Sequence, residues 1–183
     1  MPSIFDAGGW SSQLSPKLSA TLHGWLTEQG SLTQRVQSVC TPAASFNLRV
    51  LRHDLALPHR NEVALLASHG RVRTREILLC RGKTPLIFAH SIVARGDLYK
   101  AWASMDGIGG RSLGSVLFVD PAVQRGTLHY RRCDARHPLY QKALRWCGHI
   151  ERPDFFWARR AVFVRDNRPL VVTEVFLPAL FLL

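Results

Sequence analysis

The sequence predicts an α+β fold in one domain, residues 1–183, with a mainly antiparallel sheet and helical flaps. Two pairs of apolar runs are each joined by a short turn, which is typical of β-hairpins. Helical patterns gather near the start of the chain and as short insertions between strands, whereas a doubly wound fold alternates strands and helices. The length of 183 residues, without repeats or a Gly/Ser-rich linker, corresponds to one domain.

The first elements are predicted to be helical. Pro16 opens a pattern with apolar positions on one face, and Gly30 is placed to end it. Ser31 and Gln34 have the spacing of a capping box, so a second short helix should begin near Leu32. Its free backbone N–H groups could hold an anion.

Strands dominate from Phe46 onward. Alternation and apolar runs predict strands at residues 46–50, 72–80, 84–93, 127–133, 157–165 and 170–177. Arg81-Gly82-Lys83 and Asp166-Asn167-Arg168-Pro169 should close two hairpins. Short helices are expected at 97–104 and 138–146, and the apolar segment 113–119 is interpreted as β-like.

The charge of the chain at first suggests a nucleic-acid partner. There are 24 Lys and Arg residues against 13 Asp and Glu, a formal net charge of +11. The basic residues are scattered, however, and no zinc-finger, basic-region or RNP-like pattern accompanies them. We therefore expect no nucleic-acid partner, while a small anionic ligand suits the charge.

Membrane and export signals are not recognised in the sequence. The most apolar stretch, residues 170–183, is interrupted by polar residues and a proline and is too short to cross a bilayer. Residues 1–15 lack the pattern of a secretory signal. We expect a cytoplasmic monomer without stable membrane insertion.

The cysteines are expected to be reduced thiols, because four widely spaced residues do not form a disulfide framework in a chain of this length. Cys133, His137, Cys147 and His149 form a C-x3-H-x9-C-x-H run, but no standard zinc module has this spacing. We interpret the run as a buried thiol with surface histidines and expect no metal.

Two charged residues stand out because side chains alternate along a strand. Glu174 shares a face with the apolar residues Leu170, Val172 and Phe176, so its carboxylate should be desolvated and suited to hydrogen bonding or proton transfer. Arg75 shares a face with Ile77 and Leu79, and its guanidinium is matched to a carboxylate. Two alternatives remain open: these residues could form a structural ion pair, or either could lie on a solvated face.

The segment Gly110-Arg111-Ser112-Leu113-Gly114 satisfies the G-x-S-x-G pattern of a hydrolase nucleophile elbow. An elbow requires an apolar strand before the serine and a helix after it, whereas here a glycine-rich loop comes before and an apolar β-like segment follows. The segment is therefore interpreted as a turn, and its glycines fit neither dinucleotide nor P-loop motifs.

Three strings of residues resemble the chorismate lyase, or chorismate pyruvate-lyase, family of bacterial ubiquinone biosynthesis. They are Arg75-Glu76-Ile77-Leu78-Leu79-Cys80, Ser112-Leu113-Gly114 followed by Leu117-Phe118, and Thr173-Glu174-Val175-Phe176-Leu177-Pro178. The resemblance covers roughly the whole chain and is strongest from Arg75 on.

The resemblance implies a cofactor-free elimination in which chorismate loses pyruvate and becomes 4-hydroxybenzoate. It assigns Arg75 to the ring carboxylate, with help from backbone N–H groups of Leu32 and Leu113, and Glu174 to the ring hydroxyl. Whether Glu174 transfers a proton or only orients the hydroxyl during an internal hydrogen shift stays open. The helix near Leu32 and the loop before Leu113 would be flaps that enclose the product.

The sequence departs from the family pattern at two positions: Leu32 stands where the family has Met, and Ser112 where it has Pro. Both changes affect backbone placement more than side-chain chemistry. A second hypothesis is a non-catalytic domain that binds a small aromatic acid, because the fold resembles effector-binding domains of bacterial regulators. The chain shows no helix-turn-helix module before its first strand, which disfavours that hypothesis.

Overall fold

One antiparallel sheet organises the protein. The computed structural model describes residues 9–147 and 152–183, and within them seven strands pair in the order β1-β2-β3-β7-β6-β4, with β5 also paired to β6. The strands are β1 Phe46–Ala56, β2 Val72–Arg81, β3 Thr84–Ala94, β4 Gln124–Arg125, β5 His129–Asp134, β6 Phe155–Arg165 and β7 Arg168–Phe176. The predicted α+β fold with an antiparallel sheet is confirmed.

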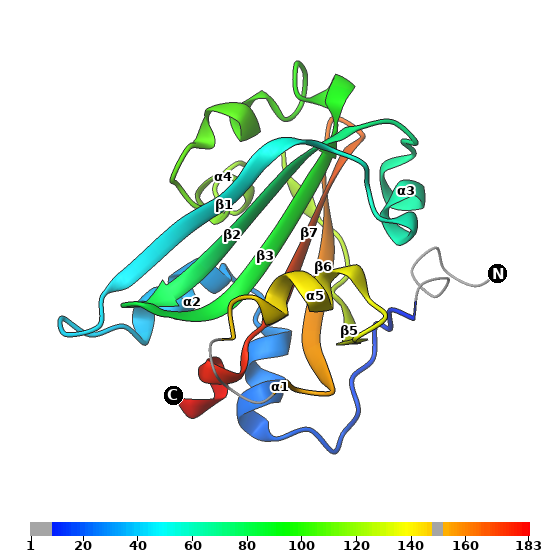
Figure 1. Ribbon diagram of the computed structural model, residues 1–183. Helices are drawn as coiled ribbons and strands as arrows, with labels where there is room; N and C mark the ends of the chain where they lie inside the picture. The colour runs from blue at the N-terminus through cyan, green and yellow to red at the C-terminus, as the bar shows by residue number, and fades with distance from the viewer. Residues whose placement is uncertain (1–8, 148–151) are drawn as a thin grey trace.

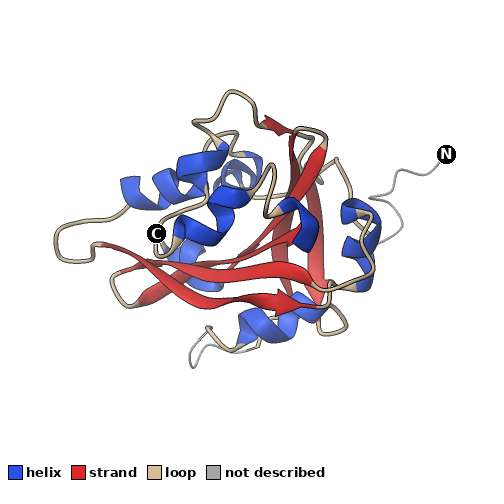
Figure 2. Cartoon of the chain, turned by 90° about the horizontal axis from the view of Figure 1, so that it is seen from above, coloured by secondary structure: helices blue, strands red, loops and turns tan. Residues whose placement is uncertain are grey.

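The helices lie on both faces of this sheet. They are α1 Ala20–Thr27, α2 Leu32–Ser38, α3 Arg60–Leu66, α4 Gly114–Leu117 and α5 Pro138–Leu144, with 3-10 helices at Arg95–Asp97, Ala103–Ile108 and Pro178–Leu182. Figure 1 shows α5 in front of the sheet and α1, α2 and α4 behind it, and Figure 2 shows helices on both sides of the curved strands. None of the helices in the described residues is long and apolar enough to span a bilayer.

Both predicted hairpin turns are confirmed. Gly82 joins β2 to β3 with φ of 59°, a conformation that glycine adopts without steric cost. In the turn between β6 and β7, Asp166 and Asn167 both have positive φ, 50° and 58°. Two consecutive left-handed residues match the twist of a tight hairpin, and Asn and Asp tolerate that conformation better than most residues.

Several helix predictions need correction. The first helix begins at Ala20, where the Ser19 side chain accepts a hydrogen bond from the Leu22 N–H, and not at Pro16. The second begins at Leu32 as expected, but Ser31 makes no side-chain capping bond, so the predicted capping box is wrong. The expected helix at 97–104 is replaced by turns flanked by two 3-10 helices.

The β-like interpretation of residues 113–119 is also wrong, because Gly114–Leu117 form the helix α4. A short apolar run does not by itself distinguish a buried strand from a buried helix. The sequence analysis also missed α3, whose capping box is formed by His59 and Glu62 in place of the usual Ser or Thr.

The apolar core is divided by the sheet. One face, here called the pocket face, packs against α1, α2 and the segment from Leu98 to Leu117, which together form the larger core cluster. The opposite face, here called the α5 face, packs against α5 and the segment around Trp10, and against α3 near Leu66. Because neighbouring residues of a strand point to opposite faces, the central strands β2, β3, β6 and β7 contribute to the cores on both faces.

Candidate active site

Two rows of side chains cross the pocket face at the centre of the sheet. Strand register places Arg75 opposite Ser91, Ser91 opposite Val172 and Val172 opposite Ala161. The next row on this face consists of Ile77, Ala89, Glu174 and Arg159, again paired from strand to strand. The two residues singled out by strand alternation, Arg75 and Glu174, therefore share a face but sit in different rows and are separated by β3.

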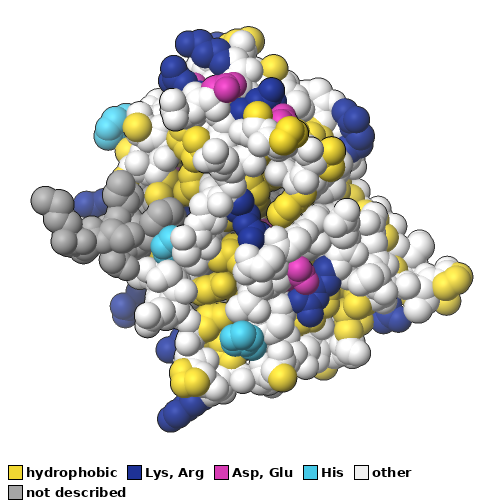
Figure 3. Space-filling view, turned by 180° about the vertical axis from the view of Figure 1, so that it is seen from behind, with side chains coloured by type: hydrophobic (Ala, Val, Ile, Leu, Met, Phe, Trp, Pro, Cys, Tyr) yellow, Lys and Arg dark blue, Asp and Glu magenta, His cyan; other side chains and the backbone are white. Residues whose placement is uncertain are grey.

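A partly enclosed cavity lies over these rows. Its walls include Ile77, Leu79, Leu128, Phe163 and Val172, so most of the lining is apolar. A mainly apolar cavity with a few polar groups is typical of a site for a small ligand. Figure 3 shows this side of the molecule, with basic side chains at its centre between hydrophobic ones.

The floor of the cavity is made by small side chains. Ala89, Ser91 and Ala161 all line it, and they occupy β3 and β6, next to β2 and β7, which carry Arg75 and Glu174. Larger residues at these positions would fill the space between the two charged groups. The sequence therefore leaves room for a ligand at the centre of a face that is otherwise packed.

Arg75 is a buried cation that does not itself line this cavity, although Ser91, opposite it on β3, does. Its side chain is 1% exposed, and Nη2 donates to the carbonyl oxygens of Gly109 at 3.0 Å and Arg111 at 2.7 Å. Among the residues that the structure describes, Nε and Nη1 have no hydrogen-bond partner. Burial lowers the pKa of Arg75 from its usual value, which reflects the cost of keeping this charge out of water. A buried guanidinium with unused donors is a binding group for an anion.

Glu174 is already paired with a different arginine. Nε of Arg159 donates to Oε2 of Glu174 at 2.6 Å, and Nη1 of Arg159 donates to the carbonyl oxygen of Glu28 at 2.6 Å. The ion pair fixes the direction of the Glu174 carboxylate within the cavity lining. Of the two alternatives left open by the sequence, an ion pair between Arg75 and Glu174 is therefore wrong.

A second arginine, Arg125, lines the cavity near the same end. It donates to the carbonyl oxygen of Gln29 at 2.7 Å and also contacts the Gln29 side chain. Its pKa is lowered by burial and by the like charge of Arg159. Two arginines thus surround one carboxylate here, and this end of the cavity has an excess of positive charge.

Two short segments cover the cavity. Residues 31–33 at the start of α2 and residues 112–114 before α4 both line it, and the hydroxyl oxygens of Thr33 and Ser112 lie 2.6 Å apart. A side chain at Gly114 would collide with the Ser31 hydroxyl. Leu32 and Leu113, the residues predicted to offer backbone N–H groups, are both buried in these segments. The positions of the two predicted flaps are therefore next to each other in space.

Three of the four predicted site residues line the cavity, namely Leu32, Leu113 and Glu174. Arg75 is not a lining residue, and its link to the cavity is its strand neighbour Ser91. The sequence analysis missed Arg159 and Arg125. Strand alternation could have found Arg159, because it shares a face with Ala161 and Phe163 on β6. Arg125 lies on a strand of two residues, which is too short to show any alternation.

The other motifs find structural explanations. Ser112, the serine of G-x-S-x-G, lies between a turn and α4, contacts Thr33 through its hydroxyl and accepts a hydrogen bond from the Gly114 N–H. The preceding strand required by a nucleophile elbow is replaced by a 3-10 helix and a turn. The interpretation of this segment as a turn is retained, although a helix follows it.

The members of the C-x3-H-x9-C-x-H run that the structure describes have separate structural roles. Burial raises the pKa of Cys133 to about 12 and that of Cys147 to about 11, which keeps both as thiols. His137 caps α5 by accepting from the Leu139 N–H at 3.3 Å, and it is buried, so its prediction as a surface histidine is wrong. His149 lies outside the described residues.

Comparisons with known proteins agree with the resemblance of the sequence. The family model for chorismate lyase matches residues 9–182. The chain is 39% identical over 172 residues to a probable chorismate pyruvate-lyase of Nitrosospira multiformis, covering 92% of this chain and 91% of that protein. It is 40% identical over 167 residues to a protein of the same name from Aromatoleum aromaticum, covering 90% and 89%.

Solved structures of similar fold include a GntR-family transcriptional regulator from Bacillus cereus. It has a TM-score of 0.54 at 15% identity, covering 73% of this chain and 92% of that one. The C-terminal domain of PhnF also has a TM-score of 0.54 at 15% identity, covering 82% and 89%. At such low identity these likenesses show only a common fold. The family match and the relatives together show that this chain belongs to the chorismate lyase family.

Proposed function

We propose that this protein is a chorismate pyruvate-lyase, which converts chorismate to 4-hydroxybenzoate and pyruvate. The observation that carries the proposal is the arrangement of charge in the cavity. Unused donors of the buried Arg75 lie on one side of a floor of small residues, and the paired carboxylate of Glu174 lies on the other. Membership of the chorismate lyase family supports the same function.

The spacing of the two groups suits a para-substituted ring. Arg75 on β2 and Glu174 on β7 are separated by β3, and their rows differ by two residues along the strand. Two strand spacings of about 4.8 Å and two residues of about 3.4 Å put their Cα atoms roughly 12 Å apart. With both side chains reaching inward, the gap fits a six-membered ring with a carboxylate at one end and a hydroxyl at the other.

In this arrangement Arg75 binds the ring carboxylate of chorismate. Its Nη1 and Nε groups are donors without partners among the described residues of the free protein. Buried donors without partners are unfavourable, and the substrate carboxylate supplies the missing partners as it binds. The backbone near Leu32 and Leu113 closes over the same ligand from the two flaps. Enclosure strengthens each electrostatic contact because it excludes water.

Glu174 accepts the hydrogen bond of the ring hydroxyl at the other end. Arg159 holds the carboxylate of Glu174 in place, and together with Arg125 it faces the carboxylate of the enolpyruvyl group. That group is attached through its ether oxygen to the ring carbon next to the one that bears the hydroxyl. A dianionic substrate thus meets cations at both ends of the cavity. Positioning of this kind is the main catalytic contribution available from these residues.

The chemical step breaks the bond between the ring carbon and the enolpyruvyl oxygen. The hydrogen on the hydroxyl-bearing ring carbon is lost, the ring becomes aromatic, and the methylene of the departing group gains one hydrogen as pyruvate forms. Chorismate is thereby divided into two products without addition of water, an oxidant or a reductant. The gain of aromaticity drives the elimination, and the 4-hydroxybenzoate formed would supply ubiquinone synthesis in the cytoplasm.

The direct test is a chorismate assay with the purified protein in the presence of a metal chelator. Pyruvate and 4-hydroxybenzoate should appear in equal amounts, with pyruvate followed by a coupled dehydrogenase and 4-hydroxybenzoate by chromatography. Absence of both products at micromolar enzyme would overturn the proposal. Tight binding of 4-hydroxybenzoate without turnover would instead support the second hypothesis, a non-catalytic domain that binds a small aromatic acid.

A further inference from the structure

A row of buried polar side chains crosses the α5 face directly behind the cavity. Register places Glu76 on β2 opposite His90 on β3, His90 opposite Thr173 on β7, and Thr173 opposite Arg160 on β6. All four are less than 9% exposed. The rows on either side are largely apolar and include Leu78, Phe88, Val175 and Ala158 on one side and Ile92, Val171 and Val162 on the other. We call Glu76, His90, Thr173 and Arg160 the back row.

Each member of the back row is the chain neighbour of a residue at the cavity. Glu76 follows Arg75, Thr173 precedes Glu174, and Arg160 follows Arg159. On β3, His90 lies between Ala89 and Ser91, which form part of the cavity floor. Any shift of the back row across the four strands therefore moves the groups proposed to bind chorismate.

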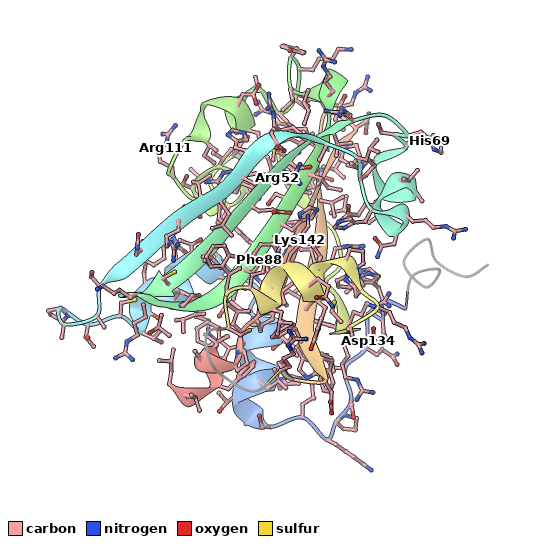
Figure 4. All side chains as sticks on the ribbon, viewed as in Figure 1. Arg52, His69, Phe88, Arg111, Asp134 and Lys142 are labelled. Carbon is pink, nitrogen blue, oxygen red and sulfur yellow. The ribbon has the colours of Figure 1, made fainter. Side chains whose placement is uncertain are left out.

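Two helices, α3 and α5, supply charged partners to the side chains of the back row. Glu62 of α3 is fully buried and lies 3.4 Å from Nε2 of His90 and 3.5 Å from Nη2 of Arg160. Lys142 of α5 forms an ion pair with Glu76. Figure 4 labels Lys142 over the sheet on the same face as Phe88 of β3. Arg160 also donates through Nε to the Thr173 hydroxyl at 2.8 Å.

His90 is the centre of this network because both ring nitrogens face carboxylates. Nδ1 lies 3.0 Å from Oε1 of Glu76, on one side, and Nε2 lies 3.4 Å from Oε1 of Glu62, on the other. A neutral imidazole has one donor and one acceptor, and its acceptor nitrogen would meet a carboxylate oxygen. Nδ1 makes a hydrogen bond with Glu76, whereas Nε2 makes no hydrogen bond among the described residues and approaches Glu62 at ion-pair distance. An imidazolium, which carries a positive charge and a proton on each ring nitrogen, suits these two carboxylates better than a neutral ring does.

The same region contains His59, Glu62 and His90, whose candidate metal-binding atoms lie within 4.8 Å of one another. The geometry disfavours a metal ion there. The rings of His59 and His90 are stacked, with 5.1 Å between centroids and 14° between planes, whereas a metal bound by two histidines must lie in both ring planes. Arg160 already provides positive charge to Glu62.

We propose that the back row is a positioning network for the active site, with protonated His90 as its central cation. The imidazolium ties Glu76 of β2 to Glu62 of α3, and Arg160 ties the same Glu62 to β6 and, through Thr173, to β7. These contacts fix the lateral spacing of Arg75, Glu174 and Arg159 on the other face. His90 acts here as a positioning residue, and its role rests on the proposed lyase function.

The electrostatics agree with a charged His90. Burial alone would lower its pKa, but the attraction of the Glu62 carboxylate and the close contacts of the ring with Glu62 and Glu76 outweigh burial and raise the pKa above its usual value of 6.5. The stabilisation is fully present below the unfolded pKa of 6.5 and is lost as the pH rises through the folded pKa. The titratable or charged groups that face His90 come from β2, α3, α5 and β6: Glu76, His59, Glu62, Lys142 and Arg160.

The test compares steady-state kinetics of the wild type, His90→Gln and His90→Arg between pH 6 and pH 10. Wild-type kcat should fall on the alkaline side as His90 loses its proton, while KM changes little. His90→Gln should lower kcat about tenfold or more even at neutral pH, because a displacement of about 1 Å can cost a hundredfold in rate. His90→Arg, a permanent cation, should restore kcat and remove the alkaline fall.

The matched control is His69→Gln, the same substitution at an exposed position on the loop after α3 that Figure 4 also labels. It should leave the rate and the pH profile unchanged. Nitrogen-15 NMR of histidine-labelled protein gives a readout that does not depend on activity. Both ring nitrogens of His90 should carry protons at pH 7.5, identified by the signals missing from His90→Arg.

Three results would each overturn the proposal. The first is a folded His90→Gln whose kcat and pH profile equal those of the wild type. The second and third apply even if that variant does not fold: a wild-type His90 that is neutral at pH 7.5, and an alkaline fall that persists in His90→Arg. Failure of the proposed lyase function is distinguishable, because the wild type would then release no pyruvate at any pH.

Discussion

On the pocket face, Nε and Nη1 of the buried Arg75 have no partner among the described residues. On the α5 face, His90 of the neighbouring strand makes a hydrogen bond with Glu76 through Nδ1, and its Nε2 lies within ion-pair distance of Glu62. Both residues are less than 4% exposed. The difference therefore lies in their partners and not in their depth. An unpaired buried charge lowers stability and awaits a ligand, while a paired one fixes the strands that carry it.

The largest expected effect comes from removing the unpaired charge. Arg75→Met should lower kcat/KM by about a thousandfold, since truncating a buried partner of a charged ligand costs about 2–5 kcal/mol. The affinity for 4-hydroxybenzoate should fall similarly, as measured by calorimetry. Arg73→Met is the matched control, because Arg73 lies on the same strand and face but pairs with Asp106. Equal losses in both variants would contradict a specific role for Arg75.

On the α5 face, removal of the Glu62 charge should mainly lower the free energy of unfolding. Glu62→Gln leaves Arg160 and His90 without their shared carboxylate, and breaking a buried ion pair from one side costs about 3–5 kcal/mol. Urea denaturation at pH 7 would measure the loss. Asp54→Asn, at an exposed ion pair, should change the free energy of unfolding by less than about 0.5 kcal/mol. An equally small change in the free energy of unfolding for Glu62→Gln would contradict the view that the charges of the α5 face stabilise the fold.

Glu174→Gln should reduce kcat by about a hundredfold, at the lower end of the range for groups that act on a proton in the transition state. The amide keeps the size of the side chain but removes the anion paired with Arg159. Substrate binding at Arg75 is unaffected, so KM should change much less than kcat. A fall in kcat/KM caused by KM alone would show that Glu174 only binds substrate.

A smaller effect is expected where the two flaps meet. The added methyl group of Gly114→Ala would collide with the Ser31 hydroxyl and crowd Ser31 Cβ, so the Ser31 side chain must turn away and the contact between the flaps is disturbed. We expect the affinity for 4-hydroxybenzoate to fall about tenfold, since enclosure by both flaps is weakened. Gly96→Ala is the control, because an added Cβ there meets no atom within 4 Å. Unchanged product affinity in Gly114→Ala would mean that the flaps do not hold the ligand.

Much of the pocket face could be predicted from the sequence because strand alternation is a local signal. It assigned Arg75 and Glu174 to inward positions without any knowledge of their partners. The same rule places Arg159 and Arg160 on opposite faces of β6. It could not show that Arg160 meets Glu62, which lies 98 residues earlier in the chain.

The helices that were missed or misassigned are short or begin with an unusual capping residue. The helix α3 is capped by a histidine, and α4 has four residues within an apolar run that also suits a strand. The network on the α5 face could therefore not be predicted, because one of its charged groups, Glu62, belongs to the missed helix α3. Its members become recognisable only when register aligns Glu76, His90, Thr173 and Arg160 across four strands.

The central claim is that the unpaired charge of the pocket face receives the ring carboxylate while the paired carboxylate receives the hydroxyl. A crystal structure of the complex with 4-hydroxybenzoate tests this most directly. We predict the carboxylate of the ligand within hydrogen-bond distance of the Arg75 guanidinium and its hydroxyl within 3 Å or so of Glu174. A ligand bound in the opposite direction, or outside the cavity, would contradict the account.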